Sequence, residues 1–241
     1  MFKTKLLSTN YKTRKGEGFG FITKGIHFAP ANLSGYEVCK YRSKGCTLSC
    51  LNYAGRGQMS SVQIARVKRT VNFHEHTQPF MEKVEKEIKS TIKSAQKNQM
   101  IACFRPNLTS DVNWAKVLLK TGKNLFDTFP HVQFYDYTKD YQKVLDNTFE
   151  NYHLTFSLSE TEKSKRQAIE LIEKGFNVAV VFSVSNKKKP LPKEYTLGNK
   201  TYPVIDGDEH DLRFLDRKGA IVGLRAKGRA KQDTSKFVVA V

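Results

Sequence analysis

Strand-like and helix-like segments alternate through the second half of the chain, and this alternation is the feature that most constrains the fold. Apolar segments typical of strands lie at 100–105, 132–137, 152–157, 176–184 and 219–225. Amphipathic segments at 112–120, 141–149 and 159–175 separate the first four, and the last of these opens with capping-box spacing and stops at Gly175. Because the units repeat at roughly 25 to 30 residues, they predict parallel strands with helical crossovers, in a barrel or an open α/β sheet.

The first hundred residues are organised differently. Residues 1–18 are polar and basic, and we expect an irregular arm there. Apolar alternation at 19–22 and 26–28 predicts the first strand, and apolar residues at three- and four-residue steps predict helices over 60–73 and 80–95. A loop rich in Lys and Pro at 186–203 is too closely bracketed by strands to separate domains, so we expect a single domain over 19–241.

Three of the four cysteines crowd into twelve residues of a Gly-containing segment at 30–57. Six residues separate Cys39 from Cys46, three separate Cys46 from Cys50, and Cys103 lies far down the chain. A disulfide would pair two of the three and strand the last, which is unusual in a secreted protein. Three thiolates can instead hold iron or zinc and leave one coordination position open. We therefore interpret the triad as a metal or iron–sulfur site, with unrelated free thiols as the alternative.

Length and hydropathy indicate a globular protein without a membrane span. The chain has 241 residues, 39% of them hydrophobic, which is enough for a core that needs no disulfides. The longest apolar stretch, around 178–182, is far short of the ~20 residues of a membrane helix. The N-terminal residues lack the apolar core and cleavage site of a secretory signal, so we expect reduced thiols in a cytoplasm.

Basic residues outnumber acidic ones by 41 to 23, which gives a formal charge of +18. Eight Lys and Arg lie between Arg213 and Lys236, opposed by two acids. Such an imbalance attracts polyanions, so a nucleic acid is a possible partner through this basic C-terminal surface. The better candidates for phosphate contacts are Arg217, Lys218, Arg229 and Lys231. Lysine-rich faces also serve solubility alone, and charge does not decide between the two.

Polar side chains follow the expected strands, where the working residues of parallel α/β folds gather. They are Asn107, Thr109, Ser110, Asp111, Asp136, Tyr137, Lys139, Ser157, Ser159, Glu160, Arg225 and Lys227. Each alone has a structural explanation, since Ser159 and Asp111 are suited to capping helices and Asp136 to a salt bridge. The cysteine segment occupies the corresponding place after the first strand, so we expect these residues to converge on one rim with the metal.

Eight segments, in order, resemble a protein family found in bacteriophage genomes, which brings no established activity with it. They are APANLSG (29–35), GCTLSC (45–50), YAGRG (53–57), NLTSD (107–111), VQFYDY (132–137), NYHLTFS (151–157), DGD (206–208) and GLRAKG (223–228). The resemblance covers most of the chain, roughly 22–233. It implies that the protein acts in the cytoplasm of a host cell.

A cysteine triad in the loop after the first strand of an incomplete (β/α) barrel also resembles the radical S-adenosylmethionine enzymes. Their triad is usually spaced by three and then two residues, and 109–111 here replace their glycine- and glutamate-containing segment. The resemblance implies a [4Fe-4S] cluster on the three cysteines, with S-adenosylmethionine chelating the fourth iron. Asp136 and Lys139 would face the substrate, and the residues implied to contact the cofactor are Thr109, Ser110, Asp111, Ser157, Ser159 and Arg225.

Two readings without catalysis remain open. In the first, a histidine such as His74 or His76 completes a closed zinc site in a nucleic-acid-binding protein. In the second, the triad staples an inhibitor or a structural phage protein. The acidic segment 206–208 is more typical of a solvated turn than of a calcium loop, and the sequence contains no Walker phosphate loop, Ser-His-Asp signature or dinucleotide glycine fingerprint.

Overall fold

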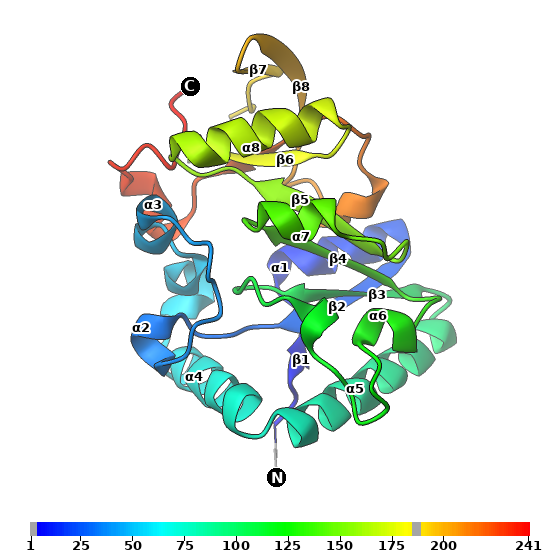
Figure 1. Cartoon of the computed structure of the whole chain (residues 1–241). Helices are drawn as coiled ribbons and strands as arrows, with labels where there is room; N and C mark the ends of the chain where they lie inside the picture. Colours follow the sequence, from blue (N-terminus) through cyan, green and yellow to red (C-terminus); the bar gives the residue numbers. More distant parts are fainter. Residues whose placement is uncertain (1–3, 185–188) are drawn as a thin grey trace.

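A nine-stranded sheet forms the centre of the computed structural model, which describes residues 4–184 and 189–241 (Figure 1). Its order is β1-β2-β3-β4-β5-β6-β9-β8-β7, and it stays open, with β1 and β7 at the edges. The strands are β1 (Leu7–Ser8), β2 (Phe21–Ile26), β3 (Ile101–Asn107), β4 (Gln133–Thr138), β5 (Tyr152–Ser157), β6 (Val178–Phe182), β7 (Glu194–Leu197), β8 (Lys200–Asp206) and β9 (Ile221–Arg225).

Six strands, from β2 to β6 and then β9, follow one another in chain order and run parallel. β8 joins β9 in the same direction, whereas β1 and β7 pair antiparallel with β2 and β8. The prediction of a single α/β domain with mostly parallel strands is therefore confirmed. Because the six strands point the same way, their carboxyl ends lie along one edge of the sheet.

One face of the sheet packs against the crossover helices. The helix α5 (Thr77–Lys97) buries Phe80, Val84 and Ile88, whose spacing places them on one side of a helix. They share a core with Phe104 of β3 and Phe134 of β4, whose rings lie 5.8 Å apart. Further helices in the crossovers are α4 (Ser60–Glu75), α6 (Leu125–Thr128), α7 (Tyr141–Leu145) and α8 (Glu162–Glu173).

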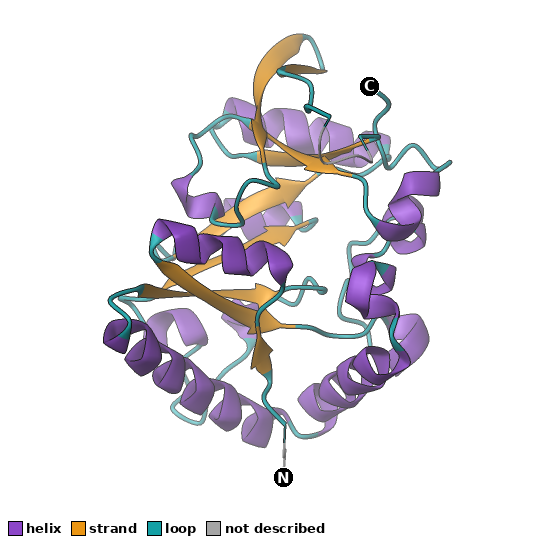
Figure 2. Cartoon of the chain, turned by 180° about the vertical axis from the view of Figure 1, so that it is seen from behind, coloured by secondary structure: helices purple, strands orange, loops and turns teal. Residues whose placement is uncertain are grey.

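The opposite face is covered by the N-terminal segment and by the stretch before β9. α1 (Tyr11–Arg14) and the 3₁₀ helix η1 (Lys15–Phe19) lie across it, as the view from behind shows (Figure 2). The centre of this layer is Asp211, which is fully buried and forms ion pairs with Lys12 and Arg105, both at 3.0 Å. The stretch expected to be an irregular basic arm is therefore folded from residue 7 onward, because Lys12 forms an ion pair with the buried carboxylate of Asp211.

Three segments differ from the expected elements. Only η4 (Trp114–Lys116) is helical within 112–120, because Asn107 Oδ1 accepts from the Val112 amide and from Trp114 Nε1 and holds the chain in a loop. The Lys/Pro loop contains the β7–β8 hairpin, and residues 186–188 of that loop lie outside the described residues. Thr161, not Ser159, caps α8, since its hydroxyl accepts from the Ser164 amide.

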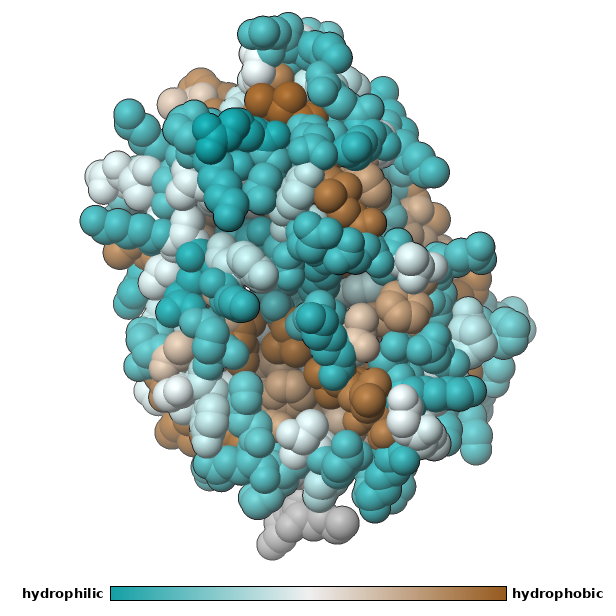
Figure 3. Space-filling model, viewed as in Figure 1, coloured by the Kyte–Doolittle hydropathy of each residue, from teal (hydrophilic) through white to brown (hydrophobic). Residues whose placement is uncertain are grey.

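Hydrophilic residues cover most of the face seen in Figure 3, and apolar residues gather in a depression near its centre. None of the helices in the described part of the chain is long and apolar enough to cross a membrane.

Candidate functional site

The cysteine segment leaves the carboxyl end of β2 and lies beside the C-terminal tail (Figure 1). It contains the short helices α2 (Ala31–Ser34) and α3 (Lys44–Leu48) and the 3₁₀ turns η2 (Leu51–Tyr53) and η3 (Gly55–Gln58). Cys46 lies on α3, and Cys50 immediately precedes η2. Gly45 is required by the tail, because a Cβ there would lie 2.4 Å from Ser235 Oγ and 2.6 Å from Phe237 Cβ.

The three clustered thiols lie within electrostatic reach of one another, and all are free. Burial raises the pKa of Cys39, and the neighbouring charges of Asp111, Cys46 and Cys50 raise it further. Burial also raises the pKa of Cys46 and of Cys50. Within 4–184 and 189–241, however, no three His, Cys, Asp or Glu side chains are arranged as a ready-made metal site. The thiols are therefore neighbours that do not form a ready-made metal site in the described part of the chain.

Asp111, in the loop after β3, joins the cysteine segment to the sheet. Its amide N–H donates to the Val38 carbonyl at 2.7 Å and also bonds the Cys39 thiol, where it opposes the rise in the thiol pKa. Its carboxylate accepts from the Thr138 hydroxyl and the Lys139 amide, both at 2.7 Å, and pairs with Lys143 Nζ at 3.2 Å. The predicted closeness of Asp111 to a cysteine is present in the structure, with its carboxylate engaged by protein groups.

Lys139, which follows β4, places a buried cation at the same edge. Its Nζ donates to the Ser157 carbonyl and hydroxyl at 3.0 Å and to the Leu158 carbonyl at 3.1 Å. Burial lowers the pKa of Lys139, while the charges of Cys46, Asp111 and others oppose that effect. Lys139 and Ser157 are thus brought together beside the thiols.

Glu160, in the turn after β5, fixes the helix that carries Cys46. Its carboxylate accepts from the Ser43 hydroxyl at 2.7 Å and from the Gly45 amide at 2.8 Å. Burial alone would raise the pKa of Glu160, but these hydrogen bonds hold it below its usual value. The residue is at a strand end in the sequence, yet its role depends on a contact with a segment more than a hundred residues away.

Several predicted site residues form hydrogen bonds within the protein that hold neighbouring loops and strands in place. Asp136 is fully buried, where it accepts from the Asn107 amide at 2.8 Å and from the Tyr152 hydroxyl at 2.9 Å, and burial raises its pKa to about 6. It supports the loop after β3 and has no exposed surface for a substrate. Thr109 donates to the Phe28 carbonyl, Ser110 donates to Asn107 Oδ1, and Ser159 is buried near Thr161.

Arg225 ends β9 at the same edge of the sheet, but in the described part of the chain it contacts the 206–208 turn and not the residues around the thiols. Its Nη1 bonds both carboxylate oxygens of Asp206 at 2.8 Å, and its amide donates to Asp208. Asp208 also pairs with Lys227, so the acidic 206–208 turn is neutralised by basic side chains. Among the described residues, the guanidinium of Arg225 contacts Lys189, Asp206 and Asp208, and none of these belongs to the cysteine segment.

The two histidines considered as zinc ligands lie at the end of α4. The His74 ring stacks on Tyr36 at 4.5 Å, and His76 ends the helix. The basic residues predicted to contact phosphates divide into two places. Arg217 and Lys218 precede the amino end of β9, whereas Arg229 and Lys231 follow its carboxyl end on η6 (Gly228–Gln232).

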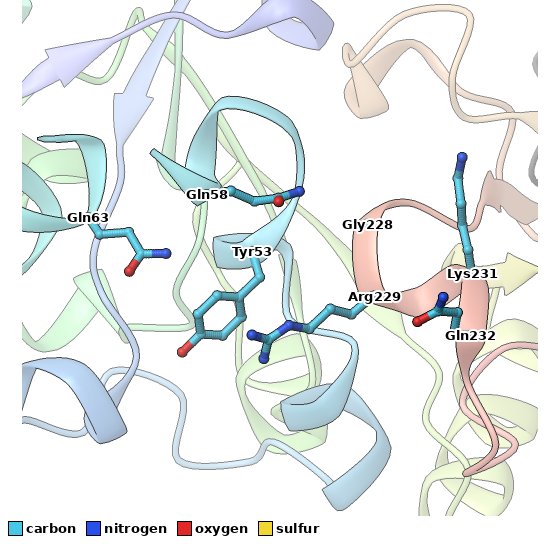
Figure 4. Close-up of a pocket in the computed structure, with 7 residues that line it drawn as sticks. All are labelled: Tyr53, Gln58, Gln63, Gly228, Arg229, Lys231 and Gln232. Atoms are coloured by element: carbon cyan, nitrogen blue, oxygen red, sulfur yellow. The ribbon is translucent and has the colours of Figure 1, made fainter. Parts of the chain in front are cut away.

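A hollow of about 560 Å³ lies beside the cysteine segment (Figure 4). It lies between residues 53–63 and residues 228–232, which are far apart in the sequence. Tyr53 was not among the predicted site residues. The Arg229 guanidinium lies over the Tyr53 ring, 3.9 Å from its centroid. Arg66, which is buried nearby, donates to Asn52 Oδ1 at 2.7 Å and fixes the turn after Cys50.

A sequence profile of a protein family described as Gene product 88 matches residues 3–240. No curated protein and no solved structure matches the chain.

Proposed function

The chain belongs to the Gene product 88 family of bacteriophage-associated proteins, and we propose that it is an iron–sulfur enzyme of the radical S-adenosylmethionine type. The observation that carries the proposal is the gathering of Cys39, Cys46 and Cys50 in the loop after the first of six parallel strands that follow in chain order. Radical S-adenosylmethionine enzymes carry their cysteine triad in the same place, in the loop after the first strand.

The donor set fits an iron–sulfur cluster. Three free thiols are soft ligands for iron, and they lie in one segment at the edge where parallel α/β folds place their sites. Their raised pKa values favour the protonated form, so ligation by iron would release protons. Because no ready-made metal site is present in the described part of the chain, the proposal requires the cysteine segment to rearrange on binding.

The neighbouring residues have roles in this proposal that follow from their contacts. Lys139 supplies a positive charge beside the thiols, and Glu160 holds the helix of Cys46 in place. The Asp111 amide holds the chain next to Cys39 through its hydrogen bond to the Val38 carbonyl. When bound, the cluster and S-adenosylmethionine would supply a 5′-deoxyadenosyl radical by reductive cleavage. The proposal keeps Asp111 as a residue near that cofactor, because it lies beside Cys39.

Anaerobic reconstitution with iron and sulfide tests the proposal directly. We expect a brown protein with about four irons per chain, visible absorption that bleaches on reduction, and release of 5′-deoxyadenosine and methionine from S-adenosylmethionine. A colourless protein that binds one zinc per chain would overturn the proposal and favour the zinc-stabilised alternative. A brown protein that leaves S-adenosylmethionine intact would retain the cluster and reject the radical chemistry.

A further inference from the structure

We propose that the hollow beside Tyr53 binds single-stranded nucleic acid and presents it to the cysteine segment. This inference names a substrate class for the proposed enzyme and rests on that function for its purpose, although binding itself can be measured without it. The hollow joins η2, η3 and α4 on one side to η6 on the other (Figure 4). The two sides are in close contact, because a Cβ at Gly228 would lie 3.0 Å from Ala54.

The charge of the side chains that line the hollow suits a strand that carries phosphates. It carries two cations, Arg229 and Lys231, both exposed, and no carboxylate. The nearest acid in the sequence, Asp233, caps the end of η6. Its carboxylate is occupied by the Ser235 hydroxyl, the Val238 amide and, at 3.4 Å, the Ser49 hydroxyl. The positive charges of the hollow are therefore available to phosphates. At a volume of about 560 Å³ it also lies within the size range of small-ligand sites.

The lining also suits bases. Single-stranded nucleic acids are recognised by stacking on aromatic side chains or on arginine planes, together with hydrogen bonds to base edges. Arg229 over the Tyr53 ring provides such a platform. The amide side chains of the lining carry both donors and acceptors, as base edges do, and they are Gln58, Gln63 and Gln232.

The hollow lies close to the thiols, so a strand bound in it would be near the proposed cluster. Tyr53 follows Cys50 by three residues, and the charge of Arg229 acts on the Cys50 thiol. A strand held by Arg229 and Lys231 would therefore lie next to the proposed iron–sulfur cluster. Arg217 and Lys218 are at the other end of β9, which separates them from this site.

Fluorescence anisotropy with a fluorescein-labelled, mixed-sequence single-stranded DNA tests the proposal on the full chain. The variant R229Q/K231Q should bind about tenfold more weakly than wild type at low salt, and its log–log salt slope should be smaller by about 1.4, or about 0.7 for each lost phosphate contact. The matched control is R217Q/K218Q, which loses the same charge from exposed residues and should change affinity by less than about threefold. Tyr53→Leu, which keeps the charge, should also weaken binding.

Equal losses in the two double variants, or no binding by wild type at low salt, would overturn the proposal. Displacement of the label by a mononucleotide as effectively as by unlabelled oligonucleotide, at equal nucleotide concentration, would also overturn it in favour of a free nucleotide. Iron content measured on the same variants separates this proposal from the proposed function. Strand binding by a protein that takes up no iron would leave the binding site standing and reject the cluster.

Discussion

Glu160 accepts a hydrogen bond from the Gly45 amide at 2.8 Å, and this contact ties the carboxyl end of β5 to the helix that carries Cys46. The same carboxylate bonds the Ser43 hydroxyl, which itself accepts from the Cys46 amide at 3.1 Å. One acidic residue thus fixes the first turn of α3. Because the helix has only five residues, it depends on such outside contacts more than on its own hydrogen bonds.

Replacing Glu160 with Gln should weaken this attachment. The amide keeps one acceptor but loses the charge and one acceptor oxygen, so we expect a loss of about 1 kcal/mol in the free energy of unfolding. Urea unfolding of the reduced protein measures it. Glu162→Gln is the control, since that side chain is 76% exposed and its pairing with Lys165 contributes little. A Glu160 variant as stable as wild type would show that the contact does not hold α3.

Single Ala substitutions at Cys39, Cys46 and Cys50 should each abolish binding of the iron–sulfur cluster. Each removes one of three thiolate ligands, and the described residues offer no ready-made replacement. Iron and sulfide analysis after anaerobic reconstitution measures the loss. Full iron content in the Cys46 variant would contradict the assignment of the site.

Cys103→Ala provides the matched control for these three variants. Its thiol is buried in β3, 3.0 Å from the Thr23 hydroxyl, and burial raises its pKa to about 12. We expect it to retain its iron and to lose about 1 kcal/mol of stability from the small cavity.

The periodic elements of the fold could be predicted from the sequence. The strand β5 has the expected bounds, and α4 and α5 contain the expected helical stretches. The apolar face that predicted α5 is buried against the core, whereas α4 buries Arg66, Thr70 and Phe73. The β7–β8 hairpin was missed because most of its residues are partly or fully exposed and Pro203 lies within a strand. The folded N-terminal segment was missed because its anchor is a buried pair between Lys12 and Asp211, which leaves no local pattern.

The site could be predicted only in part. The spacing of the cysteines and the position of Asp111 and Lys139 after strands are sequence features, and the structure brings these residues together. Contacts between distant segments could not be read from the sequence. The pairing of Tyr53 with Arg229 is one of them, and the occupation of Arg225 by Asp206 is another.

His153 should make the protein less stable in mild acid. Burial lowers its pKa to about 4, with the charges of Arg213 and Lys218 acting in the same direction, and Nε2 has no hydrogen-bond partner among the described residues. The unfolded chain takes up the proton near pH 6.5 and the folded chain only near pH 4, so the contribution of His153 is complete above pH 6.5 and is lost as pH falls towards 4. Between pH 7 and 5 the loss should be about 1–2 kcal/mol.

Urea unfolding of wild type and His153→Gln over this pH range isolates the effect. At pH 8 both side chains are neutral, so their difference there reports packing alone. A gap between the two proteins that stays constant from pH 8 to pH 5 would contradict the prediction.

Lys139→Met should make the proposed iron–sulfur cluster harder to reduce. Reduction adds a negative charge, and a buried cation near the thiols stabilises the reduced state more than the oxidised state. A unit charge about 10 Å away at an effective dielectric constant near 20 changes the potential by on the order of 50 mV, towards more negative values in the variant. Redox titration followed by visible absorption measures the change. Lys165→Met is the control, since Lys165 is exposed on α8 and pairs with Glu162. Equal potentials in wild type and Lys139→Met, at equal iron content, would show that Lys139 is only a structural link to Ser157 and Leu158.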